Sequence, residues 1–164
     1  MKRVLAGDSL AVGLAAPLRR IWPGLACVAR DGRQSWEEQH IPADAALVII
    51  SLGTNDADAR APEGWETGYA ERLHAIMRQA GAARLVWLLP PAMGDSGLEF
   101  FVEQRRAVIR NAASRAGALL FPPWPGPAYQ EFMDGWRIRE CDGVHYTAIG
   151  YSLWAVAIAK AAGG

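Results

Sequence analysis

Residues 45–52 read AALVIISL, a run that is apolar at all positions but one. Continuous apolar runs are typical of strands buried on both faces of a parallel sheet, whereas a strand with one wet face alternates apolar and polar residues. Residues 84–89 (RLVWLL) have the same character after the first position, and shorter apolar runs occupy residues 3–6, 25–29 and 118–121. The sequence therefore predicts about five strands in the interior of a sheet.

Longer amphipathic stretches separate these runs, with apolar residues at helical spacing and Gly or Pro where a helix would end. The predicted helices are residues 10–22, 62–80, 98–116 and 147–162. Pro62 suits a first helical turn and Thr147 suits an N-cap. Alternating strands and helices imply parallel βαβ units, so we expect a single α/β domain over residues 1–164, folded as a three-layer αβα sandwich.

Charge balance, cysteine content and the absence of long apolar segments indicate which partners, bridges and compartment to expect. Lys and Arg total 17 and so do Asp and Glu, and this balance gives no indication of a nucleic-acid partner. Two cysteines, Cys27 and Cys141, are too few for a disulfide framework; we expect free thiols, with a single bridge as the alternative. Because the first residues lack the apolar segment of a signal peptide and no run could span a bilayer, we expect a cytoplasmic protein, unless a secretion leader was removed.

Residues that carry chemistry should follow the strands, because active sites of parallel sheets form beyond the carboxyl ends of the strands. Gly7-Asp8-Ser9-Leu10 follows the first predicted strand and opens a helix. A serine there presents its hydroxyl at the sheet edge and its backbone N–H where negative charge develops on an attacked carbonyl. Ser9 is therefore a candidate nucleophile; the alternative is that Ser9 only caps the helix.

A second candidate, Asp142-Gly143-Val144-His145, lies just before the last predicted helix. A serine hydroxyl needs a base, and histidine suits this role when a carboxylate holds it in the correct tautomer. An Asp three residues before a His, with a Gly between them, can supply both groups from one turn. The alternative is a surface histidine beside an Asx turn, and we expect His40 and His74 to be structural or solvated.

Gly53-Thr54-Asn55-Asp56 follows the buried strand of residues 45–52. The side-chain amide of Asn55 can donate to an oxyanion, although these residue types also form ordinary turns. We expect Asp56 to brace the loop and Asp58 to be solvated, rather than to bind a metal. Gly32, after the second predicted strand, is a candidate for a further backbone N–H donor.

These blocks, taken in order, resemble the SGNH hydrolases, also called GDSL esterases and lipases. The resemblance runs from residue 7 to about residue 151, and its loosest part is the glycine block, Ala-Arg-Asp-Gly-Arg-Gln-Ser. It implies a flavodoxin-like fold and a Ser9, His145, Asp142 triad. It also implies an oxyanion hole from the N–H groups of Ser9 and Gly32 and the Asn55 side chain, with no metal or cofactor.

Three functions remain open. The leading one is hydrolysis or transfer of an O-acyl group, most simply acetyl, on a carbohydrate or small ester. A lysophospholipase or acyl thioesterase would need an apolar groove, for which residues 90–98 and 121–136 are candidates. The third is a non-catalytic binding domain.

Residues 121–140 predict a long loop in which Trp124 and Trp136 either stack on a sugar or cover the core.

Overall fold

The protein is described by a computed structural model covering residues 1–37, 39–56 and 64–163. Its centre is a five-stranded parallel sheet with the order β2-β1-β3-β4-β5. The strands are β1 (Arg3–Gly7), β2 (Ala26–Cys27), β3 (Leu47–Ser51), β4 (Arg84–Leu88) and β5 (Leu119–Phe121). The predicted parallel sheet is confirmed, and β3, the strand in the sequence AALVIISL, lies at its centre and is buried along its whole length.

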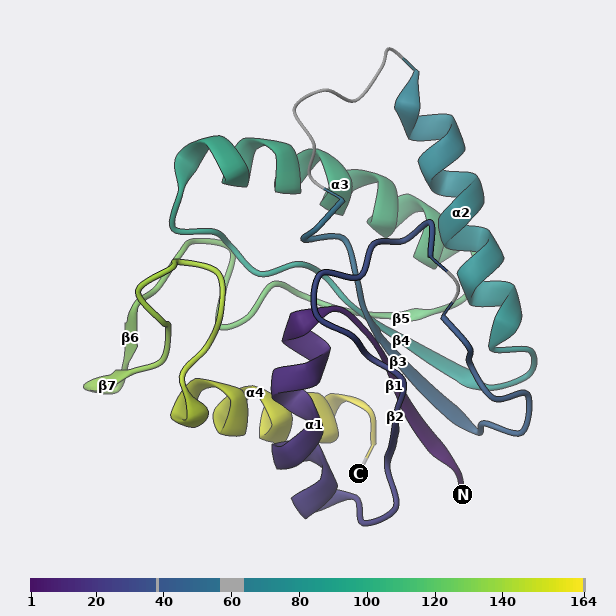
Figure 1. The fold of residues 1–164 in the computed structure, drawn as a ribbon, viewed down its shortest axis with the longest axis horizontal. Coiled ribbons are helices and arrows are strands. Elements are labelled where there is room, and N and C mark those ends of the chain that lie inside the picture. The colour runs from purple at the N-terminus through teal and green to yellow at the C-terminus, as the bar shows by residue number, and fades with distance from the viewer. Residues whose placement is uncertain (38, 57–63, 164) are drawn as a thin grey trace.

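Helices cover both faces of the sheet. As Figure 1 shows, α1 (Ser9–Ile21) and α4 (Ala148–Ala161) lie on one face, and α2 (Trp65–Gln79) and α3 (Ser96–Arg115) lie on the other. Successive strand residues point to opposite faces, so Ile49 packs with the α1/α4 layer and Ile50 with the α2/α3 layer. Two apolar layers therefore enclose the sheet, which confirms the predicted αβα sandwich.

Most boundaries lie within two residues of the prediction, and three differences matter for the fold. The second strand is only Ala26–Cys27, because this edge strand pairs with β1 alone. The described part of α2 begins at Trp65, and Pro62 lies outside the described residues. The predicted loop of residues 121–140 contains a short hairpin.

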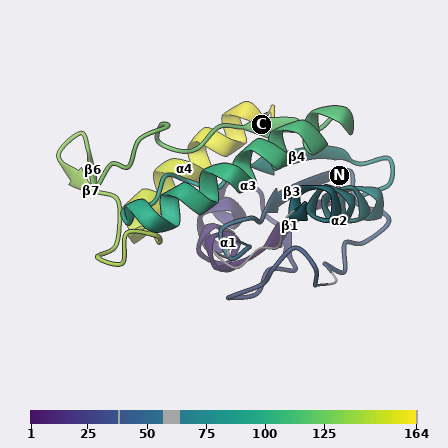
Figure 2. The same cartoon turned by 90° about the horizontal axis from the view of Figure 1, so that it is seen from above.

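This hairpin consists of β6 (Phe132–Met133) and β7 (Trp136–Arg137). Asp134 and Gly135 form its turn, both with positive φ (50° and 82°), which is the backbone conformation that a two-residue hairpin turn needs. Figures 1 and 2 show the hairpin projecting from one end of the molecule, away from the N-terminus. The prediction of an unbroken loop was wrong here, because an Asp-Gly pair is itself a hairpin signal.

The carboxyl ends of four strands lie in register across the sheet. Gly7 is paired with Ser51, Ser51 with Leu88 and Leu88 with Phe121. A Cβ on Gly7 would lie 2.0 Å from the Ser51 carbonyl oxygen, so only glycine allows β1 to end in this position. The segments that follow these strands therefore begin side by side at one edge.

Two further observations concern membrane-spanning helices and the cysteines. None of the described helices is long and apolar enough to cross a membrane. Cys27 and Cys141 are both free thiols, as expected, and Cys141 is exposed.

Candidate active site

Ser9 is the first residue of α1, directly beyond the end of β1. The helix is capped by the preceding residue: the Asp8 carboxylate accepts a hydrogen bond from the Leu10 N–H at 3.0 Å. The alternative that Ser9 serves as the N-cap is therefore wrong, and its hydroxyl is available for another partner. Ser9 itself is half-buried.

The partner of Ser9 comes from the other end of the chain. His145 Nε2 lies 2.8 Å from Ser9 Oγ, although the two residues are 136 positions apart in the sequence. His145 Nδ1 lies 2.6 Å from Asp142 Oδ2. The structure thus brings all three predicted residues into contact, in the order hydroxyl, imidazole and carboxylate that a serine triad requires.

The turn of residues 142–145 holds this carboxylate in place. Asp142 Oδ1 accepts the backbone N–H groups of Val144 (2.8 Å) and His145 (2.9 Å), and Gly143 between them has φ 69°. Partial burial alone would raise the pKa of Asp142, but the hydrogen bonds from His145 and Val144 outweigh it and lower the pKa to about 2. Asp142 is therefore ionised at neutral pH and can hold a proton on Nδ1 of the imidazole.

The predicted oxyanion donors lie on two loops that are tied together. Asn55 Nδ2 donates to the Arg33 carbonyl oxygen at 3.2 Å, and Gln34 Nε2 donates to the Asn55 carbonyl oxygen at 2.8 Å. Gly32 lies in the adjacent turn with φ 69°. Within the described part of the chain, no hydrogen bond engages the N–H of Ser9 or of Gly32. Their role as oxyanion donors stays a prediction.

Asp56 links these loops to the helices behind them, as expected of a bracing residue. Its Oδ1 accepts the Ser35 N–H and its Oδ2 accepts the Tyr69 hydroxyl, both at 2.9 Å. Its carbonyl oxygen accepts Arg105 Nε at 2.8 Å. Burial raises the pKa of Asp56. Asp58 lies outside the described residues, and among those described no group of three or more acidic, His or Cys side chains could hold a metal.

Asp8, directly before Ser9, has an environment that the sequence did not indicate. It is completely buried, and its Oδ2 has no hydrogen-bond partner among the described residues. Burial raises its pKa to about 7 against the hydrogen bond from Leu10, and the nearby charge of Asp56 adds to the rise. Two adjacent residues that can both cap a helix are not distinguished by sequence alone.

The remaining tryptophan and histidine candidates differ in where they lie. Trp124 stacks on Trp154 with ring centroids 6.2 Å apart, and its carbonyl oxygen accepts the Tyr146 hydroxyl at 2.5 Å, so Trp124 packs against the core. Trp136, on the hairpin, is 60% exposed. His74 lies on α2, and His40 follows the loop of residues 30–37; His145 is the histidine that meets Ser9.

Comparisons with known proteins agree with this architecture. The sequence matches the family described as "Protein of unknown function (DUF459)" over residues 29–161. No match was found among curated proteins. The chain is similar to a lipase/acylhydrolase from Enterococcus faecalis, with a TM-score of 0.76, 18% identity and 98% of this chain and 94% of that chain covered.

Two similar structures are acetylxylan esterases. The enzyme AlAXEase gives a TM-score of 0.76 at 16% identity, covering 98% of this chain and 99% of that chain. A catalytic mutant of Axe2 from Geobacillus stearothermophilus gives 0.72 at 16% identity, covering 99% and 94%. The chain therefore belongs to the DUF459 family and has the fold of the SGNH, or GDSL, hydrolases.

Proposed function

We propose that the protein is a serine esterase. The observation that carries the proposal is the pair of contacts Ser9 Oγ to His145 Nε2 (2.8 Å) and His145 Nδ1 to Asp142 Oδ2 (2.6 Å). A serine hydroxyl is a weak nucleophile, and these contacts supply the base that activates it and the carboxylate that orients the base. A binding domain would gain nothing from this arrangement, so we favour catalysis over the non-catalytic alternative.

The proposed reaction has two stages, acylation of Ser9 and its hydrolysis. Ser9 Oγ attacks the acyl carbonyl carbon while His145 Nε2 takes the hydroxyl proton. The N–H groups of Ser9 and Gly32 and the Asn55 amide stabilise the resulting oxyanion. The C–O bond to the alcohol then breaks as His145 returns its proton to the leaving oxygen. Water releases the acyl group from Ser9 by the same steps, with His145 again acting as the base.

We propose acetyl esters of carbohydrates as the substrate class. Support comes from the acetylxylan esterases among the similar structures. Trp136 adds a further reason, because its exposed ring belongs to the hairpin that leads into the turn of residues 142–145, here named the catalytic turn, and aromatic faces stack on sugars. The Enterococcus lipase/acylhydrolase favours the second candidate, an esterase for longer acyl chains.

Steady-state hydrolysis of p-nitrophenyl esters from acetate to palmitate tests the proposal, together with acetylated xylo-oligosaccharides followed by mass spectrometry. We expect the highest kcat/KM at acetate and loss of 42 Da per acetyl group from the oligosaccharides. Activity that rises with chain length would favour the longer-chain candidate. Equal activity of the Ser9→Ala variant would refute an esterase mechanism through Ser9.

A further inference from the structure

Arg139 is a buried cation close to the catalytic turn. It lies between β7 and residues 142–145, and it is only 1% exposed. Arg139 and Tyr146 form an isolated antiparallel β-bridge. The guanidinium carbon of Arg139 lies 4.2 Å from the centroid of the Tyr146 ring and 5.2 Å from the centroid of the Tyr129 ring. No acidic side chain in the described part of the chain forms an ion pair with Arg139, and its Nε and Nη1 have no hydrogen-bond partner there.

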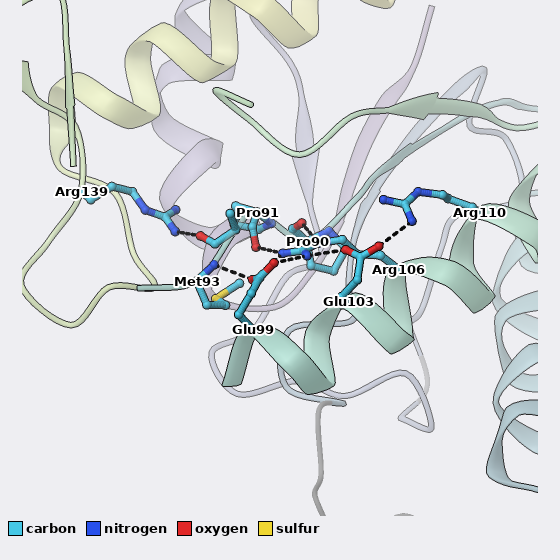
Figure 3. Close-up of polar contacts among 9 residues, drawn as sticks. Pro90, Pro91, Met93, Glu99, Glu103, Arg106, Arg110 and Arg139 are labelled. Carbon is cyan, nitrogen blue, oxygen red and sulfur yellow. Dashed lines mark hydrogen bonds and ion pairs between the residues drawn. The ribbon is translucent and has the colours of Figure 1, made fainter. Parts of the chain in front are cut away.

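The one nitrogen of Arg139 that is hydrogen-bonded, Nη2, joins two loops. It donates to the Ala92 carbonyl oxygen, in the loop after β4, and to the Gly143 carbonyl oxygen at 3.3 Å. Figure 3 shows the guanidinium extending from its own segment to this loop. Arg139 therefore connects the turn that carries Asp142 and His145 to a neighbouring part of the scaffold.

A second buried arginine provides a comparison. Arg106, from α3, donates to the carbonyl oxygens of Pro90 (2.7 Å) and Pro91 (2.5 Å) in the same loop. It is also paired with Glu99 at 2.6 Å and Glu103 at 2.7 Å (Figure 3). Arg106 thus anchors the loop to α3 with its charge compensated, whereas Arg139 is buried without an acidic partner and reaches the catalytic turn.

The catalytic turn also rests directly on this loop. Gly94 N–H donates to the Gly143 carbonyl oxygen at 2.9 Å, so this carbonyl accepts from two sides. A Cβ on Gly94 would lie 3.0 Å from Gly143 Cα, which leaves no free space between the two backbones. Because Gly143 stands between Asp142 and His145, the orientation of its carbonyl determines how the turn presents both side chains to Ser9.

Burying a cation without a counter-charge disfavours folding, and an apolar side chain of similar volume would be tolerated at lower cost. The stability of the fold therefore does not explain why an arginine occupies this buried position. We propose that Arg139 is a positioning residue: by holding the Gly143 carbonyl to the loop of residues 92–94, it keeps Asp142 and His145 aligned with Ser9. This inference rests on the proposed function.

The test compares Arg139→Lys with the matched control Arg106→Lys. Each replaces a buried arginine that donates to the loop after β4, but of the two only Arg139 also contacts the catalytic turn. Gly94→Ala provides an independent variant, since its added Cβ would lie 3.0 Å from Gly143 Cα and press on the catalytic turn. For each protein the rate constant of fluorophosphonate labelling, the final labelled fraction and the thermal midpoint are measured, with kcat and KM on p-nitrophenyl acetate.

We expect Arg139→Lys to label completely but about tenfold or more slowly, because a misplacement of about 1 Å at reacting groups can cost a hundredfold in rate. Its kcat should fall with KM nearly unchanged. Gly94→Ala should also label several-fold more slowly, while Arg106→Lys should lose thermal stability and label at nearly the wild-type rate.

Wild-type labelling rates in both Arg139→Lys and Gly94→Ala would overturn the inference. So would a lower labelled fraction at an unchanged rate, which would indicate a purely structural role, or equal slowing in Arg106→Lys. If the wild-type protein itself fails to label, the proposed function fails instead, so the two failures are distinguishable.

Discussion

Replacing Asp142 with Asn tests how the imidazole is held. Asp142 uses Oδ1 to accept two backbone N–H groups and Oδ2 to accept from His145 Nδ1 at 2.6 Å. In the variant the remaining oxygen keeps the two backbone bonds, so the new NH₂ group faces Nδ1. The imidazole then favours the tautomer protonated on Nε2, which can donate to Ser9 but cannot accept its proton.

The expected loss in kcat is about 10⁴-fold, the size seen when the carboxylate of a serine triad becomes an amide. At 1.36 kcal/mol for each factor of ten, this loss corresponds to about 5 kcal/mol of transition-state stabilisation. The free energy of unfolding should change far less, because the Asp142 side chain is 49% exposed and water screens its interactions.

Steady-state kinetics on p-nitrophenyl acetate and thermal denaturation followed by circular dichroism measure both quantities. Asp142→Asn with a wild-type thermal midpoint and a kcat within tenfold of the wild type would refute the assignment of Asp142 as the orienting carboxylate. Asp142→Ala serves as the control for loss of the turn itself, since it also removes the two backbone hydrogen bonds.

Two further predictions concern the oxyanion loops and the buried carboxyl group. Asn55→Ala should lower kcat by about 10²–10³-fold, because one oxyanion donor is lost; a change below threefold on p-nitrophenyl acetate would exclude the Asn55 side chain from the oxyanion hole. Asp8→Asn should stabilise the fold above pH 7 and change it little below pH 4, as measured by urea denaturation across this range. The pKa of Asp8 is raised from 3.8 to about 7 in the folded state, so the wild type loses stability as pH rises through this window and the loss is complete above it. About three units at 1.36 kcal/mol each give roughly 4 kcal/mol as the upper end of the effect; a difference between variant and wild type that does not depend on pH would contradict it.

The sequence was most informative where chemistry and periodicity coincide. Continuous apolar runs predicted the buried parallel strands, and polar residues directly after those runs predicted which loops meet at the sheet edge. Ser9 and His145 lie in contact because β1 and the turn before α4 both end at this edge. A topological rule about strand ends was therefore sufficient to bring together residues that are far apart in the chain.

The sequence was least informative where tertiary contacts decide the outcome. An arginine is expected at the surface, so nothing in the sequence indicates that Arg139 is buried against Tyr146. Burial of Asp8 likewise depends on the layers packed around it. The β6–β7 hairpin, by contrast, had a local signal in Asp134-Gly135 that the Pro- and Trp-rich composition of its surroundings obscured.

The most direct test of the account is whether a fluorophosphonate forms a covalent adduct at Ser9. Ser9 is the only hydroxyl-bearing residue in the tryptic peptide of residues 4–19, so peptide mass spectrometry locates the adduct without ambiguity. We predict one adduct on this peptide in the wild-type protein, none in Ser9→Ala and very slow formation in His145→Ala. A folded wild-type protein that remains unmodified, or that is modified only on another peptide, would contradict the claim that His145 activates Ser9.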